Sequence, residues 1–224
     1  MFLGHVALGM AAKRTVPRIS LAVLILAAQF ADVVWPLLVA LGIEQVAIEP
    51  GNTRITPLNF ISYPYSHSLL TLALWAIVFA CVFGLRRGRL AVPILAALVV
   101  SHWVLDVITH RPDIPILAND RTKIGFGLWN SIPGTMLVEF GMYAIGLWIY
   151  LRSTRPLDGV GRWSFAALVA FLPVVYLANV FGPPPPTVSA LWIAAFAGAM
   201  VLTVWAWWAD RHRTAVPNRT EETL

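Results

Sequence analysis

Six long apolar segments restrict the folds open to this chain more than any other feature of its sequence. A helix that crosses the hydrocarbon core of a bilayer needs about 20 mostly apolar residues, and each segment is close to that length or longer. We therefore predict an all-α, polytopic integral membrane bundle with six transmembrane helices. The six segments are residues 19–43, 67–85, 90–110, 129–151, 163–181 and 188–209.

The composition agrees with a membrane protein and excludes several other classes. Of the 224 residues, 58% are hydrophobic and 12% are charged, which leaves too little polar surface to cover a soluble domain. A soluble enzyme, a disordered protein and a nucleic-acid-binding protein are excluded on this ground, although the net charge is +5. Cys81 is the only cysteine, so no intrachain disulfide or thiolate metal cluster can form.

The positions of the basic residues predict the orientation of the bundle. Twelve of the 16 Lys and Arg residues lie in the linkers 13–18, 86–89 and 152–162 and in the tail from 210 onward, and these alternate with linkers that hold four. Lys and Arg collect on the cytoplasmic side of a membrane, so we predict a cell (inner) membrane protein with a cytoplasmic C-terminus. Aromatic residues at the opposite interface are expected to form a belt, namely Tyr63, Tyr65 and Trp129.

The beginning of the chain does not fit the count of full spans. Residues 2–12 are apolar but reach only about half of the way across a bilayer at roughly 1.5 Å per residue. We predict an N-terminal half-helix that folds back beside the first span and brings His5 level with Asp32. The domain prediction is a single transmembrane helical domain over 1–209, followed by a polar cytoplasmic tail over 210–224.

Ionisable side chains within the apolar segments are candidate functional groups. A charged side chain in a bilayer is costly and normally faces the bundle interior with a partner. At about 1.5 Å per residue, the ionisable side chains on the full spans lie at most about 15 Å below the outer ends of their segments. They are therefore at similar depths and can meet. Each alone could also be a hydrogen-bonded structural residue. The set consists of His5, Asp32, His67, His102, Asp106, His110 and Glu139.

The spacing of three of these residues favours metal binding. His102, Asp106 and His110 are spaced i, i+4 and i+8, so they form one stripe on a predicted helix. Imidazole nitrogens and carboxylate oxygens are ligands of zinc and similar divalent ions. We predict one or two divalent ions, zinc first among them, while His110 has an alternative role as a cap at the end of its helix. The predicted metal ligands are His5, Asp32, His67, His102, Asp106 and His110.

Four short motifs cover roughly the first half of the chain: GHVALGMAAKR, AAQFADVVWP, SYPYSHSLL and SHWVLDVITHRPD. Together they resemble the bacterial inner-membrane metal-dependent hydrolase family, the LexA-regulated, YdjM-like group. In that family an N-terminal Gly-His, an Asp that closes an apolar helix, a His-Ser-Leu-Leu motif and a His-x-x-x-Asp pair follow one another in this order. The resemblance implies a metal-dependent hydrolase, and the matching positions are His5, Asp32, His67 with Ser68, and His102 with Asp106.

The leading hypothesis is therefore a membrane-embedded hydrolase that acts on a lipid-like ester or phosphoester from the outer half of the bilayer. Its partners would be membrane lipids and not nucleic acid. Asp106 and Glu139 are the candidate catalytic residues, Glu139 as a general base or as an anchor behind the ligands, with a structural salt bridge or a protonated acid as its alternatives. The alternative function is a metal-ion or proton transporter or channel, since intramembrane His and carboxylate groups also mark ion pathways. A structural membrane protein is the third possibility.

Overall fold

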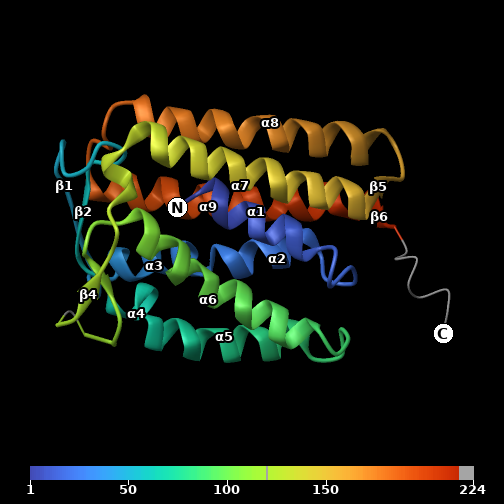
Figure 1. Cartoon of the computed structure of the whole chain (residues 1–224), viewed down its shortest axis with the longest axis horizontal. Coiled ribbons are helices and arrows are strands. Elements are labelled where there is room, and N and C mark those ends of the chain that lie inside the picture. The colour runs from blue at the N-terminus through green and yellow to red at the C-terminus, as the bar shows by residue number, and fades with distance from the viewer. Residues whose placement is uncertain (120, 217–224) are drawn as a thin grey trace.

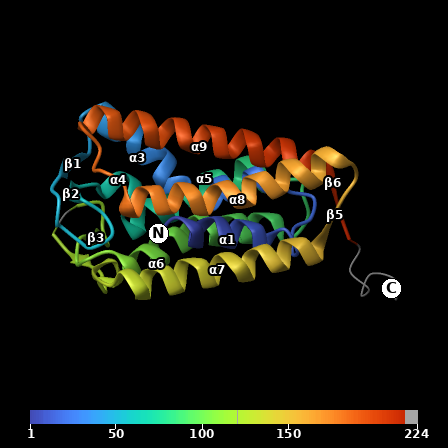
Figure 2. The same ribbon diagram turned by 90° about the horizontal axis from the view of Figure 1, so that it is seen from above.

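The computed structural model describes residues 1–119 and 121–216 as a bundle of helices that run roughly along one long axis (Figure 1). Short antiparallel ribbons cap the bundle, β1–β2 and β3–β4 at one end and β5–β6 at the other (Figure 2). The chain is mostly helical, as predicted. The helices are α1 (Leu3–Ala12), α2 (Leu21–Ala28), α3 (Phe30–Ala40), α4 (Pro64–His67), α5 (Leu69–Gly84), α6 (Ala91–Thr109), η1 (Leu128–Asn130), α7 (Ile132–Ser153), α8 (Gly159–Phe181) and α9 (Val188–Arg211). The strands are β1 (Gln45–Ile48), β2 (Leu58–Ser62), β3 (Ile114–Pro115), β4 (Lys123–Ile124), β5 (Thr154–Pro156) and β6 (Arg213–Ala215).

Polar side chains define where most of the long helices begin. Each of these side chains caps its helix by accepting a hydrogen bond from the backbone N–H three residues later. This N–H has no acceptor within the helix. The acceptors are Ser20 before α2, Ser68 before α5, Ser131 before α7, Asp158 before α8 and Thr187 before α9.

The number of helices able to cross a membrane is lower than the predicted six. Four helices, α6 to α9, are long and apolar enough, and a fifth span results if α2 and α3 are taken together, although they are bent by 61°. The predicted span 67–85 is divided, because Ser68 has an extended backbone and separates α4 from the 16-residue α5. The count of six is therefore not reached among the described residues.

A ten-residue helix, α1, occupies the position of the predicted half-helix and is buried between α2 and α7. Glycines allow this close approach. A Cβ atom at Gly146 of α7 would lie 2.7 Å from the Cα atom of Ala7, and one at Gly9 would lie 2.9 Å from the Cα atom of Ile25. Small residues of this kind let helix backbones pack closely in membrane proteins. The position of α1 therefore depends on Gly9 and Gly146.

A buried polar cluster joins several elements at the β5–β6 end. The Asp210 carboxylate of α9 accepts hydrogen bonds from Lys13 Nζ at 2.7 Å, from the Tyr150 hydroxyl at 2.8 Å and from the backbone N–H of Leu21 at 2.9 Å. These contacts connect the turn after α1 and the start of α2 with α7 and α9. In the predicted polar tail 210–224, α9 thus continues to Arg211 and β6 follows it, whereas residues 217–224 lie outside the described residues.

The space between α2, α5 and α6 is filled by a buried apolar cluster. It extends from the turn after α1 to the break between α2 and α3, so it separates the two ends of the bundle on this side. Its buried side chains include Ile19, Leu24, Leu72, Phe79, Leu95 and Leu98.

Candidate metal centre

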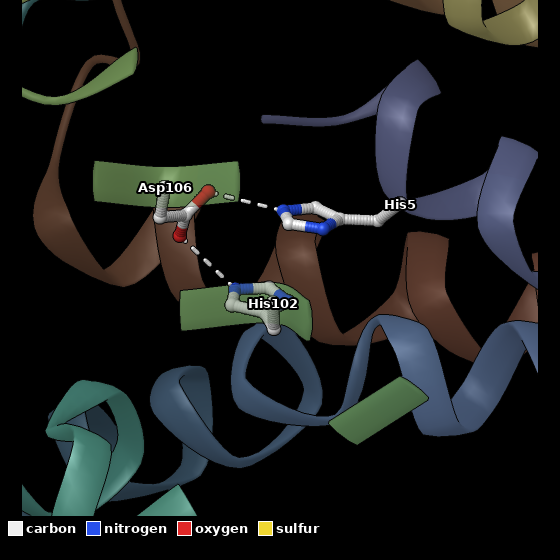
Figure 3. Close-up of side chains that lie close together, drawn as sticks. All are labelled: His5, His102 and Asp106. Carbon is white, nitrogen blue, oxygen red and sulfur yellow. Dashed lines mark hydrogen bonds and ion pairs between the residues drawn. The ribbon is translucent and has the colours of Figure 1, made fainter. Parts of the chain in front are cut away.

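Five ionisable side chains meet toward the β1–β4 end of the bundle, where α1, α3, α4 and α6 come together. They form two overlapping groups of three, and in each group the ligand atoms lie within 4.8 Å of one another. One group is His5, His102 and Asp106, and Figure 3 shows its side chains pointing toward one another. The other is Asp32, His67 and His102. Because His102 belongs to both groups, the five residues make one continuous cluster.

The Asp106 carboxylate lies at the centre of the cluster. Its Oδ1 atom is 3.0 Å from His5 Nε2, and its Oδ2 atom is 3.1 Å from His102 Nε2. The Nε2 atoms of His67 and His110 are 3.9 Å and 3.8 Å from Oδ2. Asp106 is buried, so one carboxylate is surrounded by imidazole nitrogens from α1, α4, α6 and the residue after α6.

Hydrogen bonds on the far side of the rings determine which nitrogen faces this carboxylate. His102 Nδ1 lies 2.9 Å from the carbonyl oxygen of Ala28, and His110 Nδ1 lies 2.9 Å from Oδ1 of Asp113. These oxygens can only accept, so Nδ1 is assigned as the donor in both rings and a neutral ring presents the Nε2 lone pair to Asp106. His102 Nε2 accordingly has no hydrogen-bond partner among the described residues despite its short distance to Asp106. Two acceptors that face each other in a buried site fit a cation between them.

His67 is held in the same way by two residues that the sequence did not single out. Glu44 is buried in the loop after α3, and its Oε1 atom accepts from the backbone N–H groups of Tyr65 and Ser66 at 2.8 Å. The Ser66 hydroxyl lies 2.6 Å from Glu44 Oε2 and 2.7 Å from His67 Nδ1. Because the hydroxyl donates its hydrogen bond to the carboxylate, the hydroxyl oxygen accepts a hydrogen bond from the Nδ1–H group of His67. The Nε2 atom of His67 then faces the cluster and lies 3.6 Å from Asp32 Oδ1.

His5 differs from the other histidines of the cluster. Its Nε2 atom is hydrogen-bonded to Asp106, and its ring stacks on that of His102 with centroids 3.9 Å apart and planes 5° apart. The buried Nδ1 atom of His5 has no partner among the described residues. The backbone nitrogen of Met1 also reaches Asp106, at 2.5 Å from Oδ1.

His110 lies beside the two groups and belongs to neither. Its partner Asp113 also accepts from the Tyr63 hydroxyl at 3.0 Å and from Arg111 Nε at 3.2 Å. Burial raises the pKa of the Asp113 carboxyl, but the hydrogen bonds from His110, Tyr63 and Arg111 outweigh it, and the pKa lies below its usual value. Asp113 therefore remains an acceptor that orients His110 toward Asp106.

The prediction that Tyr63 and Trp129 belong to an interfacial belt is wrong for Tyr63 and incomplete for Trp129. Tyr63 is fully buried, and its ring lies 5.0 Å from that of His67. Trp129 packs on His110 with ring centroids 4.1 Å apart. Tyr65 is 49% exposed, as a surface aromatic would be. Phe60 of β2 also packs against the site, with its ring centroid 5.0 Å from that of His110, so the ribbon β1–β2 covers this edge of the cluster.

Glu139 has a different environment from the other acids. It is buried on α7, and its Oε2 atom accepts from the backbone N–H of Gly4 at 2.8 Å while Oε1 accepts from that of Phe2 at 3.0 Å. These are free donors at the start of α1, where a carboxylate is also favoured by the helix dipole. Glu139 thus anchors the helix that carries His5 and lies in neither group of three.

Asp32 is the most accessible acid of the cluster. Its side chain is 41% exposed, whereas those of His5, His67, His102 and Asp106 are buried. Asp32 also lines a large cavity that reaches the cluster, together with His67, Asp106, His110 and Glu139. A molecule in this cavity would meet Asp32 and the edge of the cluster directly.

The donor set has the chemistry of a site for a divalent transition metal. Imidazole nitrogens with carboxylate oxygens suit zinc and similar ions, and hydrogen bonds to the outer ring nitrogens orient such ligands. Buried His and Asp groups in this structure could hold such an ion. Comparisons of the chain with family models, with curated proteins and with solved structures found no match.

Proposed function

We propose that this chain is a multi-pass membrane metallohydrolase that cleaves a lipid-like phosphoester from the outer half of the bilayer. The observation that carries the proposal is the convergence of His67, His102 and His110 on Asp106, each with its Nδ1 proton used elsewhere. A divalent ion held by such residues would polarise the bond under attack and activate water near neutral pH. The resemblance of four motifs to the YdjM-like family supports the same reaction class.

In this proposal, each residue has a role that follows from its contacts. His67, His102 and Asp106 hold the ion, with His110 at the edge of the set, and His5 joins them when its Nε2 atom gives up the hydrogen bond to Asp106. Asp32, which is accessible from the cavity, serves as a ligand exchangeable with water or as the proton acceptor. We assign Glu139 to anchoring and not to proton transfer, because backbone N–H groups occupy both of its oxygens. Catalysis would then depend on Glu139 through His5.

Transport of an ion is the competing function, and the interior of the bundle argues against it. Between His102 and Arg89 the sequence of α6 holds no ionisable residue, and its inner face packs into the apolar cluster around Leu95 and Leu98. An ion leaving the cluster along α6 toward the β5–β6 end would have to cross this packed region, and the walls of the cavity along α8 and α9 are mostly apolar. A metal centre whose ionisable residues lie toward one end of the bundle agrees better with hydrolysis than with ion conduction.

The test is an assay of lipid turnover with purified protein in nanodiscs. A panel of bacterial phospholipids and polyprenyl phosphates is incubated with and without chelator, and products are identified by mass spectrometry. We expect a metal-dependent product that is lost in Asp106→Asn and retained in His212→Ala, a histidine outside the cluster. Protein-dependent movement of zinc into sealed liposomes, with every lipid intact, would refute hydrolysis in favour of transport.

A further inference from the structure

A cavity of about 1070 Å³ extends from the metal centre along the bundle. This volume is at or above the upper end of the range of roughly 300–1,000 Å³ typical of small-molecule sites. Near the cluster its walls include Asp32, His67 and Asp106, so it is continuous with the candidate metal centre. The cavity is therefore large enough for a ligand that extends well beyond the cluster.

Away from the cluster, the walls of the cavity are mostly apolar and come from two helices. Lining residues run from Leu168 to Gly182 along α8 and its end, and from Ala190 to Trp205 along α9. At 1.5 Å per residue each wall is about 20 Å long, more than half of a hydrocarbon core of about 30 Å. Small side chains on α9 keep the groove wide, since a Cβ atom built at Gly198 meets nothing within 4 Å.

Arg54 adds a positive charge to the wall of the same cavity. It lies in the loop between β1 and β2 and is exposed. Its backbone N–H donates to the carbonyl oxygen of Trp129 at 3.1 Å, which fixes the loop beside the ring that packs on His110. In the described part of the chain, its guanidinium makes no ion pair. Arginine binds phosphate through two parallel hydrogen bonds, so this side chain suits a phosphate group.

We propose that this cavity binds a glycerophospholipid, with its phosphate between Arg54 and the metal centre and one acyl chain in the groove between α8 and α9. The assignment of the phosphate position rests on the proposed function. The polar end and the long apolar walls match the two parts of such a lipid. The bilayer around α8 and α9 consists of acyl lipids, which is why we commit to an acyl chain and not to an isoprenoid chain.

Photocrosslinking in nanodiscs tests the proposal without requiring turnover. The probes are phosphatidic acid and diacylglycerol, each with a photoreactive group in one acyl chain, and labelled peptides are identified by mass spectrometry. With chelated wild-type protein, labelling should concentrate in α8 and α9. Gly198→Phe should lower it several-fold, and Ala194→Leu provides a second obstruction of the same groove. The matched control is Gly141→Phe on α7, which also has open space at its Cβ position and does not line the cavity.

The headgroup is tested by the difference between the two probes. Arg54→Gln should reduce labelling by phosphatidic acid roughly tenfold, because a hydrogen bond to a charged group is lost, and leave labelling by diacylglycerol unchanged. Arg121→Gln, an exposed arginine outside the cavity wall, should change neither. Equal loss with both probes would overturn the role of Arg54.

The outcomes separate this proposal from the proposed function. Groove labelling that Gly198→Phe suppresses, in a protein that hydrolyses no lipid, would support the binding site and refute the hydrolase. Lipid hydrolysis with labelling spread evenly over the outer faces of α5 and α7 would refute the groove and leave the hydrolase standing. Displacement of the probe by a polyprenyl phosphate but not by unlabelled phosphatidic acid would overturn the choice of an acyl chain.

Discussion

The Nδ1 atom of His102 donates a hydrogen bond to the carbonyl oxygen of Ala28, the last residue of α2, at 2.9 Å. This contact occurs where the chain bends by 61° between α2 and α3. The same break thus directs His102 Nε2 toward Asp106 and brings Asp32 of α3 to the cluster. A position that interrupts a long apolar segment therefore contributes two parts of the candidate metal centre.

The first prediction concerns metal content. Purified protein should contain about one or two divalent ions per chain, and His102→Ala should lower this content sharply, because His102 belongs to both groups of three. Elemental analysis gives the content directly. His212→Ala removes a histidine paired with Asp158 at the other end of the bundle and should leave it unchanged. Equal metal content in His102→Ala and wild type would refute the site.

The second prediction concerns the Glu44 carboxylate. In Glu44→Gln the amide oxygen takes the position that accepts from the backbone N–H groups of Tyr65 and Ser66, so the amide NH2 group faces the Ser66 hydroxyl. An NH2 group cannot accept a hydrogen bond. The hydroxyl can therefore donate to His67 Nδ1 and stabilise the tautomer whose Nε2 carries the proton. That tautomer cannot bind a metal through Nε2, and zinc affinity should fall roughly 10- to 100-fold. Competition with a chelator of known affinity measures the change. The exposed Glu49→Gln is the control, and equal affinities in the two variants would contradict the assignment.

The third prediction concerns the packing of α1 against α7. Gly146→Leu should push α1 away from α7, because a Cβ atom at this position would overlap Ala7. Overpacking costs about 1–3 kcal/mol and should both lower the midpoint of thermal unfolding and weaken metal binding through His5. Gly141→Leu on the same helix has open space and should do neither. Normal metal affinity in Gly146→Leu would show that His5 is not needed.

The fourth prediction separates stability from the site. Asp210→Ala leaves the buried Lys13 ammonium without its carboxylate, which should cost about 3–5 kcal/mol of folding free energy. Reversible unfolding in mixed micelles measures this loss. Metal affinity of the folded fraction should stay the same, because Asp210 lies at the opposite end from the cluster. His212→Ala breaks an exposed pair with Asp158 but leaves the Asp158 cap of α8 in place, so it should change unfolding little.

The fifth prediction concerns topology. Reporter fusions after Arg89 and Arg162 should be cytoplasmic, and fusions near Asn52 and Pro184 should be extracytoplasmic, because basic linkers remain in the cytoplasm. In the structure, the basic linkers after α5 and α7 lie at the end of the bundle opposite the metal centre (Figure 1). The result therefore also decides from which side of the membrane a substrate reaches the metal centre. An extracytoplasmic signal after Arg89 would show that the bundle has the opposite orientation in the membrane.

The local chemistry of the site could be predicted from the sequence, but its outer contacts could not. His102 and Asp106 were identifiable because ionisable residues four apart on an apolar helix share one face. Glu44 and Ser66 had no such signal, since Glu44 lies in a polar linker and a serine beside a histidine is ordinary. Tyr63 was misassigned because aromatic residues near a span end are usually interfacial, whereas here the loops over the site bury it.

The sequence by itself indicated the class of this protein, since apolar segments of about 20 residues are long enough to cross a bilayer as helices, which satisfy their backbone hydrogen bonds internally. It also indicated which ionisable residues could form a metal site, because so few such side chains lie in those segments. Only the tertiary structure decided that segment 19–43 breaks at Gln29, that α1 fits between α2 and α7, and that a long cavity meets the cluster. These features depend on contacts between residues far apart in the chain, and periodicity within one segment carries no information about them.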